Sequence, residues 1–174
     1  VSDTPAEPKR PVGKVSNISF SNIIATRGGK TGCSIVGIPG HNVENVTLSN
    51  VTIRSEGGGK REWASAEIKE HPDAYPEGTM FGKLSAYGLY CRHVRGLTLT
   101  GLRLESDEPD LRHALVLDDV RDANISNLSS AFSTGAAALV RLAQSSDILI
   151  RGCKPKAPDG VYLRLEGLET TGIA

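Results

Sequence analysis

A seven-residue strand pattern that recurs along the chain constrains its fold more than any other feature. Five segments alternate apolar with polar residues and place Asn or Gly at the sixth position. They begin at Asn17, Asn45, Gly96, Asp122 and Asp147. These starts are separated by 28, 51, 26 and 25 residues. Alternation with period two is typical of a strand that buries one face.

A second strand-like run accompanies most copies of the pattern. These runs cover residues 33–38, 87–93, 113–118, 138–143 and 161–165. Each period of about 25 residues therefore holds two short strands and no amphipathic helix. A unit this short cannot bury its apolar face alone, but stacking each unit on the next buries a continuous core. The sequence predicts an all-β chain, a parallel β-helix of about five coils.

Aligning the second runs predicts the register between coils. Two columns should point inward: Leu89, Leu115 and Val140, then Cys91, Leu117 and Leu142. Two should point outward: Tyr90, Val116 and Arg141, then Arg92, Asp118 and Ala143. Arg92 and Asp118 are then expected to form an ion pair along their column. Asp118 and Asp119 should face opposite sides of the strand.

The sixth position of the pattern predicts a turn. It is occupied by Asn22, Asn50, Gly101, Asn127 and Gly152. Asn and Gly tolerate the left-handed backbone conformation, and stacked Asn amides can bond along the column. We expect one such corner in each coil.

The 51-residue spacing is one coil plus an insertion. We therefore expect an extended N-terminal segment over residues 1–14, and coils over 15–174 with a long inserted loop at about 54–85. Loops of this length are often functional. This one carries Trp63 and a cluster of polar and aromatic residues, namely Glu70, His71, Tyr75 and Glu77.

Composition excludes several partners. Twenty basic residues balance twenty acidic ones, which argues against nucleic acid as a partner. No apolar run approaches the length of a membrane-spanning helix, so no membrane is expected. The three cysteines lack CxxC spacing and the histidines lack metal-ligand spacing, so no metal or other cofactor is expected. The cysteines are interpreted as small buried hydrophobes.

Two segments carry a resemblance to a known family. Residues 75–93, YPEGTMFGKLSAYGLYCRH, and residues 35–50, which contain IVGIPGH and VENVTLSN, resemble bacterial members of glycoside hydrolase family 28, the polygalacturonase-like pectinases. The similarity runs from about Val15 to Ser130 and matches the region after the family's catalytic centre. It implies a right-handed parallel β-helix, hydrolysis of pectin (polygalacturonate or rhamnogalacturonan), a plant cell-wall polysaccharide as partner, and a secreted or periplasmic location in a bacterium.

The family's catalytic pattern is missing from the chain. Asn-Thr-Asp, Gly-His-Gly and Arg-Ile-Lys do not occur, and the Asp118-Asp119 pair stands alone late in the sequence. No catalytic residue can therefore be assigned. We expect the C-terminal part of a longer enzyme, with its acid and base upstream. No capping helix precedes Val15, so the N-terminal part of the parent protein or another subunit is expected to cover the open first coil.

Two alternatives remain. One is a non-catalytic β-helix that binds polysaccharide or serves as a structural module. The other is a polysaccharide lyase, which needs a clustered Asp, Lys and Arg site that the sequence does not provide.

The candidate substrate-binding residues are Glu70, His71, Tyr75, Glu77, Tyr90 and Arg92. Aromatic faces with a few polar groups suit carbohydrate, and Arg matches the geometry of a uronate carboxylate. The alternative is that the loop packs on the side of the β-helix with its charges in solvent.

Overall fold

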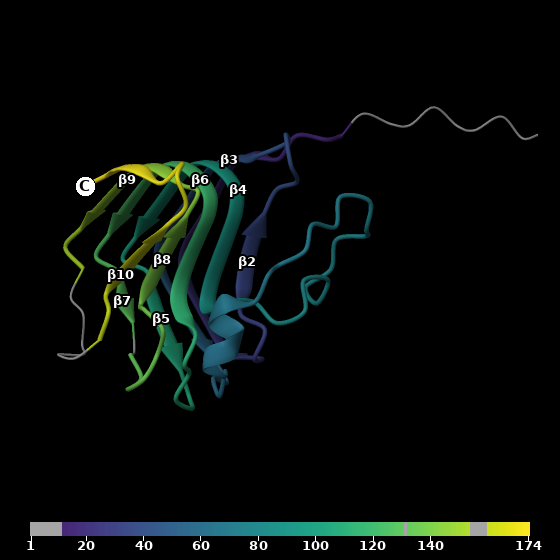
Figure 1. Cartoon of the computed structure of the whole chain (residues 1–174). Helices are drawn as coiled ribbons and strands as arrows, with labels where there is room; N and C mark the ends of the chain where they lie inside the picture. The colour runs from purple at the N-terminus through teal and green to yellow at the C-terminus, as the bar shows by residue number, and fades with distance from the viewer. Residues whose placement is uncertain (1–11, 131, 154–159) are drawn as a thin grey trace, which may run out of the picture.

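The computed structural model describes residues 12–130, 132–153 and 160–174, and in these it is almost entirely β (Figure 1). One short 3-10 helix, η1 (Arg61–Ser65), lies in the insertion between β3 and β4. The strands are β1 (Ser16–Gly28), β2 (Cys33–Val36), β3 (Val43–Ser55), β4 (Ala86–Thr100), β5 (Arg103–Ser106), β6 (His113–Ser126), β7 (Ser129–Ser130), β8 (Val140–Ala143), β9 (Ser146–Arg151), β10 (Leu163–Glu166) and β11 (Thr171–Ile173).

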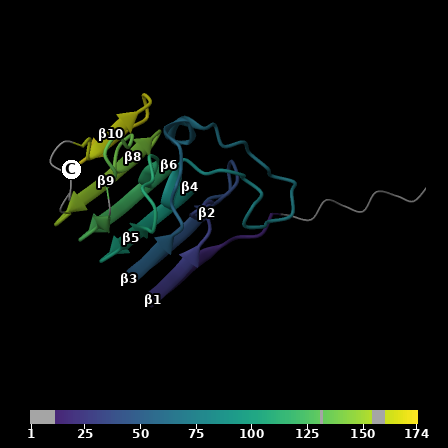
Figure 2. The same ribbon diagram turned by 90° about the horizontal axis from the view of Figure 1, so that it is seen from below.

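Every pairing between these strands is parallel, and each turn of the chain stacks on the one before it (Figure 2). The predicted parallel β-helix is confirmed. The count of coils was slightly low, since the described chain makes about six turns. The additional turn consists of β10 and β11, which pair with β8 and β9. It was missed because this last turn carries no copy of the seven-residue pattern.

The turns have three sheet faces. The first face contains β2, β8, β10 and the beginnings of β4 and β6. The second contains the beginnings of β1 and β3, the ends of β4 and β6, and then β9 and β11. The ends of β1 and β3 form the third face with β5 and β7.

Left-handed residues form the corners between faces. All five residues at the predicted corner position have φ between 54° and 64°, and Asn50 Nδ2 donates to Asn22 Oδ1 at 2.8 Å. This prediction is confirmed. A second column was not predicted: Asn45 Nδ2 donates to Asn17 Oδ1 at 2.9 Å, and both residues are left-handed as well. These bonds let each turn fix the corner of the next.

The predicted inward columns are also confirmed. Leu89 pairs with Leu115 and Leu115 with Val140, while Cys91 pairs with Leu117 and Leu117 with Leu142. These side chains are almost completely buried in one continuous core. Two other cysteines depart from the prediction of buried thiols. Cys33 is exposed in β2 near the open end of the stack, and Cys153 is half-buried.

The predicted outward columns lie outside the β-helix, but part of them is covered. Tyr90 and Val116 are fully buried and Arg92 is 4% exposed, because residues 56–85 fold over this part of the first face. Arg92 is in register with Asp118, yet the predicted ion pair between them is wrong. Arg92 pairs with Glu70 of the loop, and Asp118 accepts a hydrogen bond from Tyr90.

Of the segment expected over residues 1–14, residues 1–11 lie outside the described part of the chain. Residues 12–15 belong to no helix or strand and lead into β1. Among the described residues, no helix is long and apolar enough to cross a membrane.

Candidate functional site

The inserted loop is anchored at its root by a buried ion pair. Asp110 and Arg112 contact each other at 2.8 Å, and their side chains are at most 1% exposed. The Gly59 N–H donates to Asp110 Oδ2 at 2.8 Å, and the Leu111 N–H donates to the Gly59 carbonyl at 2.9 Å. Arg112 also donates to the carbonyls of Leu84 and Ala86 at the other end of the loop. One pair therefore holds both ends of the insertion.

Burial alone would raise the pKa of Asp110. The hydrogen bonds from Arg112 and from the Gly59 N–H outweigh that effect, so the pKa lies below its ordinary value. The carboxylate stays charged in the folded protein because its partners are fixed around it.

Above the root, the loop contributes to a second apolar core outside the β-helix. Leu84, Ala86, Tyr90 and Val116 form this core, and Val36, Ile68 and Phe81 pack against it. The guanidinium of Arg92 lies between two aromatic rings, 5.5 Å from the centroid of Phe81 and 5.8 Å from that of Tyr90. Stacking of this kind suits the flat, weakly hydrated guanidinium. The loop is thus a packed layer on the first face.

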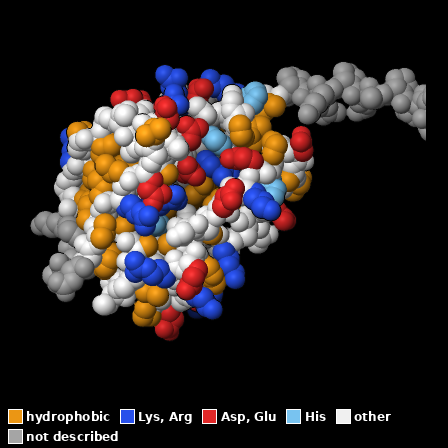
Figure 3. Space-filling view, in the orientation of Figure 1, with side chains coloured by type: hydrophobic (Ala, Val, Ile, Leu, Met, Phe, Trp, Pro, Cys, Tyr) orange, Lys and Arg blue, Asp and Glu red, His pale blue; other side chains and the backbone are white. Residues whose placement is uncertain are grey.

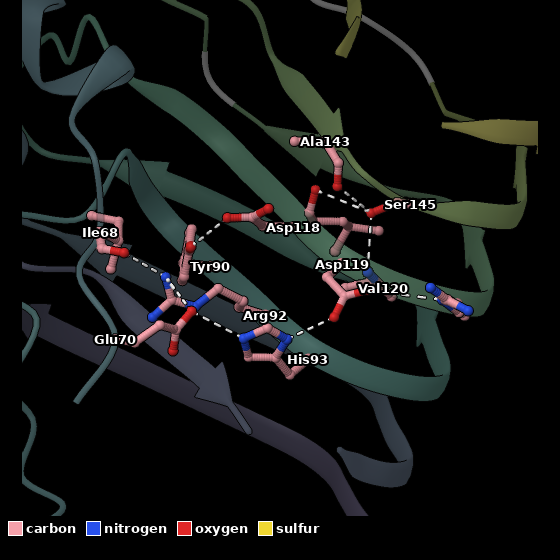
Figure 4. A network of polar contacts seen from close by, with 12 residues as sticks. Ile68, Glu70, Tyr90, Arg92, His93, Asp118, Asp119, Val120, Ala143 and Ser145 are labelled. Carbon is pink, nitrogen blue, oxygen red and sulfur yellow. Dashed lines mark hydrogen bonds and ion pairs between the residues drawn. The ribbon is translucent and has the colours of Figure 1, made fainter. Parts of the chain in front are cut away.

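Four charged or polar side chains, Glu70, Arg92, His93 and Asp119, connect the loop to this face; we call them the clamp (Figure 4). Glu70 Oε1 lies 3.2 Å from Arg92 Nη1 and 3.0 Å from His93 Nε2. His93 Nδ1 lies 2.6 Å from Asp119 Oδ2. Arg92 also donates to the carbonyls of Ile68 and Lys69. The clamp therefore fixes the loop over residues 68–70.

The backbone at Asp119 explains why it reaches the clamp. Its φ is 49°, so the alternation of β6 is interrupted there and the side chain turns to the same outer side as that of Asp118. The prediction that the two carboxylates face opposite sides is therefore wrong. Each is already engaged: Asp118 Oδ2 accepts from the Tyr90 hydroxyl at 2.9 Å, and Asp119 accepts from His93. Burial, followed by the charge of Asp118, raises the pKa of Tyr90, so the phenol is a donor.

A groove of about 740 Å³ lies beside the clamp. One wall is the loop, and the other is formed by Val12, Gly13 and Val15, by β2 and by the turn after it. Its volume is within the usual range for small-molecule sites. Figure 3 shows acidic, basic, histidine and hydrophobic side chains around the loop on this side of the molecule. Its lining includes Ile38, His41, Glu70, His71, Glu77 and Phe81.

The structure divides the predicted binding residues into two sets. Glu70, His71 and Glu77 line the groove, and the His71 ring lies 6.0 Å from that of Phe81. Tyr75 is 85% exposed at the outer part of the loop. Tyr90 and Arg92 lie beneath the loop and support its inner side. Direct contact of these six residues with a substrate stays a prediction.

One groove residue was missed by sequence reasoning. His41 lines the wall opposite the loop and is held by a small backbone turn, in which the His41 N–H donates to the Ile38 carbonyl at 2.8 Å. The Pro39-Gly40 step before it is a turn signal that predicts this bend. The sequence does not reveal that the inserted loop comes to lie opposite it.

The arrangement can bind a ligand with apolar and hydroxyl-bearing faces. Carboxylate and imidazole groups can hydrogen-bond hydroxyls, while Phe81, Ile38 and Val36 offer apolar surface. In the part of the chain that the structure describes, no group of three or more His, Cys, Asp or Glu side chains is placed to hold a metal ion.

Fold and site together define a parallel β-helix protein with a loop-walled surface groove. No family model, curated protein or solved structure matches the chain.

Proposed function

We propose that the chain binds a pectic polysaccharide in the loop-walled groove, as the β-helix part of a polygalacturonase-like glycoside hydrolase. The groove itself carries the proposal: it is a hollow of ligand size with aromatic, apolar and hydrogen-bonding sides. The segment whose sequence resembles the pectinases, residues 75–93, contributes to both the loop wall and the β4 strand beneath it. The resemblance therefore covers part of the site, including Glu77 and Phe81.

The proposal places the catalytic acid and base outside these 174 residues. Glycoside hydrolysis needs one carboxyl to protonate the leaving oxygen and another to activate water. Three carboxylates near the groove, those of Glu70, Asp118 and Asp119, already accept bonds from Arg92, Tyr90 or His93. They support the shape of the site rather than offering a free acid–base pair.

Binding is tested with a variant that fills the groove. Gly78 lines it, and a Cβ added there meets nothing within 4 Å. Gly78→Leu should weaken binding of pectic oligosaccharides at least tenfold by calorimetry, because it occupies ligand space. Gly29→Leu is the matched control, since Gly29 has the same free surroundings but lies outside the groove. Equal affinity of wild type and Gly78→Leu would reject the groove as the binding site.

A non-catalytic polysaccharide-binding module is the second candidate, favoured by the same engaged carboxylates. The two candidates differ in turnover. Release of reducing ends from polygalacturonate and rhamnogalacturonan should be absent for this chain in either case. Turnover by the folded chain would contradict both, and Glu70 and Glu77, the two carboxylates that line the groove, would then be replaced first.

A further inference from the structure

The charged side chains along the groove indicate which charge state of the ligand it favours, a point that the sequence resemblance does not address. Among the described residues that line it, none is Lys or Arg. Its charged side chains are the carboxylates of Glu70 and Glu77, and its other titratable groups are the two imidazoles of His41 and His71. Glu70 is already paired with Arg92, so Glu77 is the carboxylate that a polyanion would meet as a like charge, and the described lining offers no Lys or Arg as a counter-charge.

The nearest buried cation cannot supply that counter-charge. The Arg92 side chain is 5% exposed, and its guanidinium is engaged by Glu70 and by the carbonyls of Ile68 and Lys69. Lys14 is not part of the groove lining, and its exposed side chain is paired with Glu44 at 2.7 Å. A uronate carboxylate entering the groove would lose hydration without gaining an ion pair, which is unfavourable.

Apolar surface dominates the rest of the lining. Val36, Ile38, Met80 and Phe81 are joined by Pro72 and Pro76 from the loop. A methyl ester removes the charge of a uronate and adds a small apolar group, and it would gain from such a surface. Resting on the proposed function, we infer that the groove takes methyl-esterified galacturonan in preference to the de-esterified polymer.

The experiment compares oligogalacturonides of one length that differ only in methyl esterification. Binding to the whole chain is measured by calorimetry at pH 7.5 and at two salt concentrations. We expect the esterified ligand to bind at least tenfold more tightly, with the difference shrinking as salt rises, because screening weakens repulsion between charges.

A charge variant separates specificity from shape. Glu77→Gln should raise the affinity for the de-esterified ligand several-fold and leave that for the esterified ligand unchanged, since it removes one like charge and keeps the bond that Glu77 accepts from Thr79. Glu67→Gln is the matched control, because Glu67 is exposed on the same loop outside the groove lining; it should change neither affinity.

The outcomes distinguish this inference from the proposed function. Equal or tighter binding of the de-esterified ligand in the groove would overturn the ester preference and leave the binding of pectic polysaccharide standing. Binding of neither ligand would overturn both.

Discussion

At the scale of single residues, two buried ionisable side chains near the loop root respond to their surroundings in opposite ways. Asp110 is surrounded by donors and stays charged, as its lowered pKa indicates. His113 has one partner, since Nδ1 donates to the Ala138 carbonyl at 2.8 Å, and it stays neutral. Burial lowers the pKa of His113 to about 4, although the bond to Ala138 opposes this shift. A buried side chain keeps its charge only where hydrogen-bond donors or counter-charges surround it.

Asp110→Asn should destabilise the fold by about 3–5 kcal/mol, because it leaves the Arg112 guanidinium buried without a counter-charge. The free energy of unfolding in urea measures this loss. Asp107→Asn is the control: Asp107 pairs with Arg54 at the surface, and such pairs contribute less than about 1 kcal/mol. Similar losses for the two variants would contradict the structural role of the buried pair.

His113 predicts a pH dependence with a definite sign. Its folded pKa, about 4, is lower than its unfolded value near 6.5, so the unfolded state binds the proton first as pH falls. Stability is complete above about pH 6.5 and declines between pH 6.5 and 4, by about 3 kcal/mol from this group. His113→Gln should flatten that part of the curve in urea unfolding. An unchanged slope would show that His113 does not carry it.

At the scale of elements, the clamp predicts local stability that differs from global stability. Arg92→Met keeps the apolar stem but removes the bonds to Ile68, Lys69 and Glu70. Amide hydrogen exchange over residues 66–81 should accelerate at least tenfold, while exchange in β6 stays slow. Arg95→Met on the same strand is the control, since Arg95 is exposed. Uniform acceleration in both elements would mean that Arg92 supports the whole fold.

The strand elements could be predicted from the sequence because their signal is local. Alternation of Leu89, Tyr90 and Cys91 fixes which side chains face the core, and the stack repeats that choice at each turn. Asn50 likewise identifies its corner, since few residues accept a left-handed backbone. The left-handed backbone at Asp119 was not predicted, because an Asp within a strand-like run does not by itself indicate a corner.

The groove could be predicted only in part, because it depends on where the loop comes to lie. Glu70, His71 and Glu77 were found as a polar cluster on a long insertion, which is a local signal. That Arg92 would turn toward the loop rather than toward Asp118 depends on contacts between residues more than twenty positions apart. The position of His41 in the site could not be predicted for the same reason, since the loop that faces it is distant in sequence.

At the scale of the whole molecule, the two ends of the stack expose apolar surface. Phe20 and Ile23 belong to inward columns, through their pairing with Leu48 and Val51, yet they are 46% and 37% exposed in β1. At the other end Leu165 is 50% exposed, and hydrophobic side chains gather on this side of Figure 3. Among the described strands, β1 pairs only with β3. An uncovered parallel edge with an apolar row beside it favours association.

We expect copies of this chain to associate through the β1 turn, because β1 pairs with no described strand other than β3. Sedimentation should show mass increasing with concentration, and Phe20→Glu should shift the chain toward monomer because it places a charge in the contact. Leu168→Glu, at the opposite end and 97% exposed, decides the geometry. If Leu168→Glu leaves association intact, the β1 turns of two copies meet each other in a closed dimer. If Leu168→Glu also abolishes association, the β1 end of one copy meets the opposite end of the next, and the assembly is open. A wild-type chain that stays monomeric at high concentration would show that this end does not need a cover.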